Sequence, residues 1–351
     1  MKKLRVGYWP LSASLKSPGD RRRLIFWAKA RGHAIITDLS QKVDVIVASE
    51  NSDFNSKVFF QRETPVIFDL VDAYLSPLNV YDDIARGLAK KISGQISGRA
   101  KPFSKHIKDF CVNSNAVICS SIEQEEIIKN YNANTFIILD SHDEIPFIEP
   151  ILDRTQTQKA RNILWEGQPA TIRGIGQISS VLSELSKTGD VHFNFVTDER
   201  YFQVLGKYFK KETIKILETE ASRFFDCVNI VPWTVNNLVN IARSSSVAMI
   251  PIDLLVPMQG LKPENRLLIM WRLGLPCLTS PSFAYTRVGI QAGVNTSCPA
   301  PEDWTNSFNR LLSDPIFAYN EVLRGQNYLR ENHNRSILLN KWDAVVESVM
   351  S

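Results

Sequence analysis

Short apolar runs that alternate with helical patterns constrain the fold of this chain more than any other feature. Several runs are rich in Val and Ile at consecutive positions, which is typical of strands buried on both faces of a parallel sheet. In the first half, the expected strands are Leu4–Trp9, His33–Leu39, Val43–Ser49, Pro65–Leu70, Ala116–Ser120 and Phe136–Asp140. In the second half, they are Asn162–Glu166, Val191–Thr197, Val228–Trp233, Ser246–Ile252 and Pro276–Thr279.

Helical patterns occupy the spaces between these strands. They cover Arg21–Arg31, Ile122–Asn130, Gly176–Ser186, Asn236–Ala242 and Arg266–Leu273, and residues 317–350 are also largely helical in pattern. Because a strand–helix–strand repeat with parallel strands requires right-handed crossovers, the pattern predicts doubly wound α/β sheets.

The pattern restarts once, after the polar, proline-containing stretch 141–160, which is typical of an interdomain linker. We therefore expect two Rossmann-like domains, 1–150 and 151–325, facing each other across a cleft, followed by a helical segment, 326–351. Ligands of such sheets bind beyond the carboxyl ends of the strands, so each domain would hold one ligand.

Composition narrows the classes of function. The 351 residues include 41 Lys and Arg against 37 Asp and Glu, and a net charge of +4 is too small to indicate nucleic acid but suits anionic ligands such as diphosphates. The five cysteines form no CxxC pair, which favours reduced thiols in a cytoplasmic protein and gives no metal site. No run approaches the roughly 18 apolar residues of a membrane span. Any membrane contact is therefore expected at the surface, on the inner face.

The segment 17–23 follows the first expected strand and opens the first helix. Gly19 permits a sharp turn, and a helix N-terminus next to Arg21 favours an anion. The alternative is an ordinary helix start, with Asp20 as N-cap and three solvated arginines.

Two carboxylates, Asp69 and Asp72, end the buried run at Pro65–Leu70. Either would serve as a general base towards a hydroxyl if burial raised its pKa. The alternative for Asp72 is to cap the next helix. Asp72 is the stronger catalytic candidate of the two.

The segment 165–174 opens the second domain with Gly167 after a strand and Arg173 near the next helix, which is a favourable arrangement for a phosphate. The overlapping run 174–179 approaches a dinucleotide fingerprint, but Ser179 stands at its last position and no acidic residue ends a suitable second strand. A nicotinamide site is therefore disfavoured.

The segment 262–276 lies between two buried strands. A helix beginning near Pro263 would place its N-terminus at the ligand edge, with Lys262 and Arg266 beside a diphosphate, and Gly274 and Pro276 would end it. The alternative is an ordinary surface helix.

A basic stretch, 86–108, contains seven Lys and Arg and no acidic residue, with apolar residues between them: Leu88, Ile92, Ile96, Phe103 and Ile107. It would suit an anionic membrane or a phosphorylated acceptor. The alternative is a solvated helical face.

The order of these segments resembles the GT-B superfamily of nucleotide-sugar glycosyltransferases, in particular its family 4-like group. The resemblance covers nearly the whole chain. It rests most on residues 262–268 with the G-x-P turn at 274–276, and less on 18–21, 31–33, 116–121, 164–167 and 231–233.

The resemblance implies where the site residues lie and that the last helix crosses back onto the first domain. It implies contacts with the donor for Gly19, Arg21, Gly167, Arg173, Trp233, Lys262, Glu264, Asn265 and Arg266, and it makes Asp20 and Asp72 the catalytic candidates. Many retaining members carry two glutamates eight positions apart, whereas Leu261 and Ile269 stand at those places here. Glu264 is the candidate substitute.

The expected activity is transfer of a sugar from a nucleotide-diphosphate sugar to a hydroxyl of a glycan or a lipid-linked acceptor. No cofactor is expected and a metal is not required, because arginine and helix amides would offset the charge of the leaving diphosphate. Two alternatives stay open, since fold alone does not decide function: a nucleotide-sugar epimerase and a non-catalytic sugar-binding protein.

Overall fold

The computed structural model describes residues 2–59, 63–76, 79–152, 161–202 and 210–351. The chain divides into two compact units. The first contains Met1–Asp143, Leu261–Pro263 and Asn334–Ser351, and the second contains Glu144–Gly260 and Glu264–His333. The last eight residues of the stretch expected as a linker, 153–160, lie outside the described residues.

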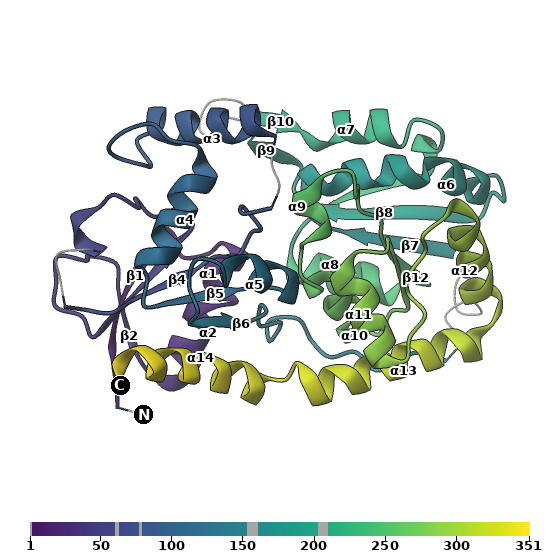
Figure 1. The fold of residues 1–351 in the computed structure, drawn as a ribbon. Coiled ribbons are helices and arrows are strands. Elements are labelled where there is room, and N and C mark those ends of the chain that lie inside the picture. Colours follow the sequence, from purple (N-terminus) through teal and green to yellow (C-terminus); the bar gives the residue numbers. More distant parts are fainter. Residues whose placement is uncertain (1, 60–62, 77–78, 153–160, 203–209) are drawn as a thin grey trace. The chain divides into compact units, whose positions relative to one another are not determined.

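The first unit is built on a six-stranded parallel sheet with the order β2-β1-β3-β4-β5-β6 (Figure 1). Its strands are β1 (Arg5–Trp9), β2 (Ala34–Ile36), β3 (Val45–Ser49), β4 (Val66–Asp69), β5 (Ala116–Cys119) and β6 (Thr135–Ile137). Every residue of β3, β4 and β5 is buried, which explains their continuous apolar runs. All the strands expected in this half are confirmed.

Helices cover this sheet, and one of them comes from the far end of the chain. They are α1 (Pro18–Arg21), α2 (Leu24–Arg31), the 3₁₀ turn η1 (Lys57–Phe59), α3 (Val80–Ile92), α4 (Phe103–Asn113), α5 (Ile122–Ile128) and α14 (Arg335–Met350). Trp342 of α14 stacks on Trp27 of α2 at 5.8 Å, and the indole of Trp27 donates a hydrogen bond to Asp343. The expected return of the last helix to the N-terminal domain is confirmed.

The second unit is built on a five-stranded parallel sheet with the order β11-β8-β7-β12-β13. Its strands are β7 (Arg161–Glu166), β8 (Val191–Thr197), β11 (Val228–Pro232), β12 (Val247–Ile250) and β13 (Cys277–Thr279). An antiparallel pair, β9 (Arg200–Phe202) with β10 (Lys210–Glu212), was not expected, because it carries no apolar run.

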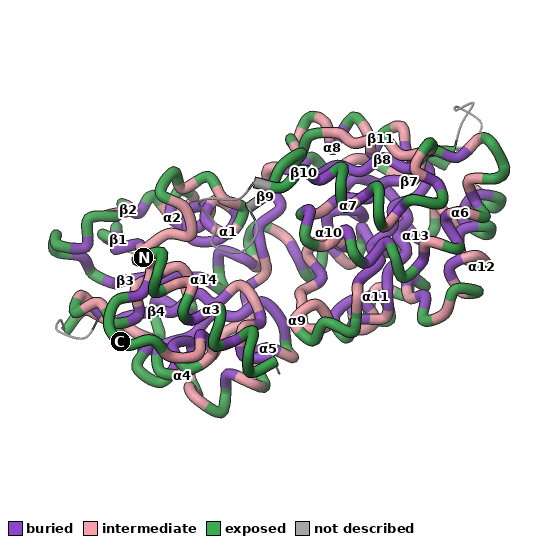
Figure 2. The backbone as a smooth tube through the Cα atoms, turned by 90° about the horizontal axis from the view of Figure 1, so that it is seen from above, coloured by how far each residue is buried: buried purple, intermediate pink, exposed green. Residues whose placement is uncertain are grey.

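The helices of the second unit follow the strands. They are η2 (Pro169–Ile178), α6 (Ser179–Ser186), α7 (Thr213–Glu220), η3 (Phe225–Cys227), α8 (Val235–Arg243), α9 (Pro257–Gly260), α10 (Asn265–Arg272), α11 (Phe283–Ala292), α12 (Pro301–Ser313) and α13 (Pro315–Asn332). Buried residues, purple in Figure 2, concentrate along the central strands of each sheet, while the edge strands β2, β6 and β11 contain none. Both units are therefore Rossmann-like domains.

The helix expected at Gly176–Ser186 begins later than the sequence pattern predicts. Residues 169–178 form the 3₁₀ stretch η2, and the α-helix starts at Ser179. Gly174 explains part of this, because a Cβ there would lie 2.3 Å from the carbonyl oxygen of Pro251. The glycine lets η2 approach the end of β12, while glycine also lowers α-helix propensity.

None of the helices within the described ranges has the length and apolar content needed to cross a bilayer.

Candidate functional site

The loop after β1 is organised around the carboxylate of Asp20. Ser17, not Asp20, caps α1, so the alternative with Asp20 as N-cap is wrong. The Asp20 side chain is fully buried and accepts five hydrogen bonds of 2.6–3.0 Å, which come from the Tyr8 hydroxyl, the Leu11 and Ser12 amides, and the Ser12 and Ser17 hydroxyls. These contacts shape the loop, and the catalytic role of Asp20 stays a prediction.

The arginines that follow do not share one environment. Arg21 is half-buried and donates to the Lys16 carbonyl at 2.8 Å. Arg22 and Arg23 are buried, so the alternative of three solvated arginines is also wrong. Gly19 is a close-packed position, because a Cβ there would lie 2.3 Å from Leu11.

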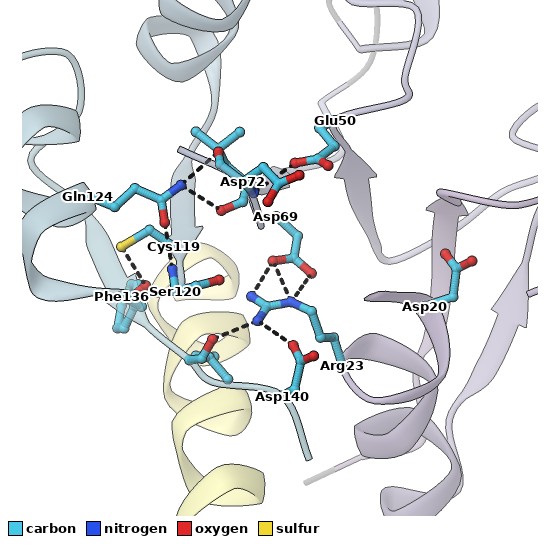
Figure 3. A network of polar contacts seen from close by, with 12 residues as sticks. Asp20, Arg23, Glu50, Asp69, Asp72, Cys119, Ser120, Gln124, Phe136 and Asp140 are labelled. Carbon is cyan, nitrogen blue, oxygen red and sulfur yellow. Dashed lines mark hydrogen bonds and ion pairs between the residues drawn. The ribbon is translucent and has the colours of Figure 1, made fainter. Parts of the chain in front are cut away.

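Arg23 ties the carboxyl ends of two strands together inside the first unit (Figure 3). Its guanidinium contacts both oxygens of Asp69, the nearest at 2.5 Å, and donates to the Ile138 carbonyl at 2.7 Å and to Asp140 at 3.4 Å. Removing one partner of such a buried pair costs about 3–5 kcal/mol, because the other charge is left uncompensated. Asp69 is therefore occupied in holding the sheet edge.

Asp72 remains accessible at the same edge. Its side chain is 38% exposed, and its carboxylate lies 4.0 Å from the ammonium group of Lys262, which also belongs to the first unit. The amide of Gln124 fixes the preceding turn by donating to the carbonyls of Leu70 and Asp72 (Figure 3). Asn79 caps the following helix, so the alternative of Asp72 as a helix cap is wrong.

Glu50 joins Asp72 and was missed by sequence reasoning. It directly follows β3, and its carboxylate accepts the Asp72 amide at 3.0 Å (Figure 3). Burial is the main cause that raises the pKa of Glu50 to about 8, and the negative charge of the neighbouring Asp72 carboxylate contributes to the same rise. The available signal was its position, since Glu50 follows a buried strand just as Asp72 follows the next one.

In the second unit, Arg266 lies on the turn that follows β7. It stands in the first turn of α10, and its guanidinium donates to the carbonyl of Glu166 and lies 5.1 Å above the ring of Trp165. A Cβ on Gly167 would lie 3.0 Å from the guanidinium carbon, so glycine permits this approach. Two predicted residues, Gly167 and Arg266, therefore meet at the carboxyl edge of the sheet.

Glu166 connects this arginine to Trp233. The indole of Trp233 donates to Oε1 of Glu166 at 2.9 Å, and Oε2 lies 3.7 Å from Nε of Arg266. Glu166 is buried at the last position of β7. Sequence reasoning included Glu166 in this segment but gave it no role.

The remaining predicted residues are distributed as follows. Glu264 immediately precedes α10, is buried and lies 3.9 Å from Arg287, while Asn265 is the first residue of α10. Arg173 is exposed on η2, and its charge partly offsets the rise in the pKa of Glu220 that burial causes. Lys262 is placed beside Asp72 in the first unit.

No known protein-family profile matches this sequence, and none of the curated proteins does. Solved structures do match. WaaG, a glycosyltransferase involved in lipopolysaccharide biosynthesis, is 11% identical, with 98% of this chain and 99% of that chain covered and a TM-score of 0.57. A UDP-forming α,α-trehalose-phosphate synthase from Burkholderia xenovorans is 12% identical, with 88% and 74% covered and a TM-score of 0.56.

TarM is 12% identical and has a TM-score of 0.59, with 86% of this chain covered. The match spans 54% of the TarM chain, so this chain corresponds to about half of that protein. A TarM variant from S. aureus was solved with fondaparinux, α-GlcNAc-glycerol and UDP.

The chain has the GT-B fold. Its structural neighbours are GT-B glycosyltransferases of the family 4-like kind, and the likeness, at 11–12% identity, extends to the fold. One departure of this GT-B chain is internal to α10. Ile269, which stands where many retaining members carry a glutamate, is 2% exposed and packs in the core.

Proposed function

We propose that this protein is a glycosyltransferase that moves a sugar from a nucleotide-diphosphate sugar to a hydroxyl of a glycan or a lipid-linked acceptor. The observation that carries the proposal is the position of Arg266. Its guanidinium lies at the first turn of α10, against the glycine turn after β7, at the sheet edge where α/β domains bind ligands. The GT-B fold and the UDP bound to TarM support the same class of donor.

In the proposed donor site, Arg266 and the positive N-terminal end of α10 offset the charge of the leaving diphosphate. The carboxylate of Glu166 pairs with Arg266, and in the proposed complex the phosphate oxygens of the donor take its place. Trp233, which donates a hydrogen bond to Glu166, would contact the nucleobase of the donor. Gly19, Arg21, Arg173, Lys262, Glu264 and Asn265 complete the proposed donor contacts. The carbon–oxygen bond to the diphosphate breaks, and the acceptor oxygen forms the new bond.

On the acceptor side, we assign Asp72 as the group that takes the proton of the attacking hydroxyl. Its carboxylate is accessible, and it lies 4.0 Å from the ammonium group of Lys262. Glu50 supports the Asp72 backbone from behind through the hydrogen bond to its amide.

The first test is thermal stabilisation by a panel of nucleoside diphosphates and nucleotide-sugars, because a ligand that binds only the folded state raises the melting temperature. We expect one nucleotide to raise it clearly, and Arg266→Ala to remove that shift and to lower turnover by about 10²–10³-fold. Arg243→Ala, an exposed arginine at the end of α8, is the matched control and is expected to behave as wild type.

The outcomes separate the alternatives. Near-normal turnover in Arg266→Ala contradicts the assigned donor site. Conversion of the donor without an acceptor assigns an epimerase. Absence of a shift with every nucleotide assigns a non-catalytic protein, a reading that the buried Ile269 in place of a glutamate favours.

A further inference from the structure

Helix α3 exposes its apolar side to solvent. Val80, Ile84, Leu88 and Ile92 are spaced four residues apart and therefore form one stripe along the helix. Their exposed fractions are 68%, 47%, 47% and 69%, and Tyr81 beside the first of them is 81% exposed. The stripe runs the full length of a strongly amphipathic helix, whose apolar face would be expected to pack on the core.

The polar side of α3 is the side that packs on the protein. Asp83 accepts the amide and the hydroxyl of Ser104 at 2.8 and 2.5 Å, at the start of α4. The guanidinium of Arg86 lies 5.2 Å from the ring of Tyr74, and the ammonium of Lys90 lies 4.5 Å from the ring of Phe103. These contacts determine the rotation of α3 about its axis and direct the apolar stripe outwards.

Close backbone packing fixes the same rotation. A Cβ on Gly87, on the inner side of α3, would lie 2.0 Å from the carbonyl oxygen of Lys101. Any larger residue would push the helix away from α4. The outward direction of the stripe is therefore built into the helix packing.

These contacts correct the expectation for the basic stretch 86–108. Ile96, Phe103 and Ile107 are buried core residues, whereas Leu88 and Ile92 are exposed. Of the five apolar residues of the basic stretch, only Leu88 and Ile92 therefore lie on the surface. Its apolar part is the α3 stripe, which begins before the basic stretch, at Val80.

The charge around the stripe indicates what covers it. Of the seven Lys and Arg in residues 79–108, Arg86 and Lys90 pack inwards and Lys101 pairs with Asp109, which leaves four against the exposed Asp82. Lys91 is exposed and lies about three turns after Val80, on the side of the stripe, and Arg99 and Lys105 are also exposed. Two copies of this surface would repel each other, so the occupant is anionic as well as apolar.

We propose that α3 lies flat on an anionic bilayer, with the stripe in the boundary between headgroups and acyl chains and the exposed cations at the lipid phosphates. Tyr81 has the amphipathic side chain that favours this boundary. The inner side of α3 carries Lys90, whose charge acts on Glu50. If the proposed function holds, bilayer contact would bring a lipid-borne hydroxyl towards Glu50 and Asp72.

Co-sedimentation of the full chain with vesicles tests this proposal without donor or acceptor. We expect binding to vesicles that contain phosphatidylglycerol, weaker binding as salt rises, and little binding to phosphatidylcholine alone. Leu88→Gln with Ile92→Gln should weaken binding about tenfold or more by removing apolar contacts. Lys91→Gln with Arg99→Gln and Lys105→Gln should remove the preference for anionic lipid.

Ile290→Gln, which changes a 75% exposed residue of α11, is the matched control and should bind as wild type. All these side chains are exposed, so the melting temperature and the nucleotide-induced shift should stay unchanged. Loss of vesicle binding with an unchanged nucleotide-induced shift concerns α3 alone, whereas absence of the shift in wild type concerns the proposed function. Equal vesicle binding by wild type and the Leu88/Ile92 variant overturns the proposal. The proposal is also overturned if gel filtration shows a wild-type dimer that the Leu88/Ile92 variant abolishes, because the stripe would then bind a second copy of the chain.

Discussion

At the scale of single residues, two buried ionisable side chains of the first unit differ in charge: Arg23 is charged, whereas Glu50 favours its neutral, protonated form. Arg23 is fully buried and fully partnered by Asp69, Asp140 and a carbonyl, so its charge is stabilised where it stands. Glu50 accepts one amide in a buried position beside another carboxylate, so its protonated form is favoured. The first arrangement maintains structure, and the second provides a group that titrates close to neutral pH.

We predict that Glu50 makes stability fall as pH rises. The folded state keeps this proton up to about pH 8, whereas the unfolded chain releases it near 4.5. Between these values the folded state binds more protons, so the free energy of unfolding declines with pH. Glu50→Gln removes this contribution. Urea unfolding at several pH values across this window should therefore show a shallower decline in Glu50→Gln than in wild type. Parallel curves would contradict the prediction.

At the scale of elements, α13 holds the helix that carries Arg266. A Cβ on Gly325 would lie 2.4 Å from the buried ring of Trp271 on α10. The amide of Gln326 donates to the carbonyl of Trp271 at 2.9 Å and to that of Ile148 at 2.8 Å. The position of α10 at the sheet edge therefore depends on close helix packing behind it.

Gly325→Ala is expected to destabilise the protein by about 1–3 kcal/mol, because a large buried ring must move to admit one methyl group. The displacement of α10 should also reduce the nucleotide-induced rise in melting temperature. Chemical denaturation and the thermal-shift panel measure the two effects. Gly260→Ala is the matched control, since a Cβ there would meet only Leu254 at an ordinary 3.9 Å. Similar losses in both variants would show that the Trp271 contact is not the cause.

At the scale of the whole molecule, neither unit is a continuous piece of chain. The first unit takes in Leu261–Pro263 from the middle and Asn334–Ser351 from the end. α14 contributes Leu338, Trp342, Val345 and Val346 to the core that also contains β1, β3 and α2. The N-terminal sheet is therefore complete only when the last helix has been added.

Trp342→Ala should destabilise the first unit by about 3–5 kcal/mol, because it removes a fully buried ring that stacks on Trp27. Hydrogen exchange should accelerate in β1 and α2 more than in β7 and β8. Ile316→Ala, at a 66% exposed position of α13, serves as control and should change neither unit. Faster exchange confined to the second unit would contradict the assignment of α14.

The parallel sheets were predictable because their strands are buried on both faces, which leaves continuous apolar runs such as Val45–Ser49 in the sequence. Glycine turns and the arginine at a helix start are also local signals, and they located Gly167 and Arg266 correctly on elements that meet. The resemblance to family 4-like enzymes added the return of the last helix. The strands, the glycine turns and the arginine follow from short-range pattern, whereas the return of the last helix came from the resemblance.

Tertiary structure decided which side chains face each other. Glu166 and Arg266 are one hundred positions apart, and Glu50 meets Asp72 only because β3 and β4 are neighbours in the sheet. Periodicity locates the stripe on α3 but not its direction, because the apolar or the polar side of a helix turns inwards according to the partners it finds. Asp20, buried by its own loop, shows the same limit: burial and pairing depend on the packed fold and not on local sequence.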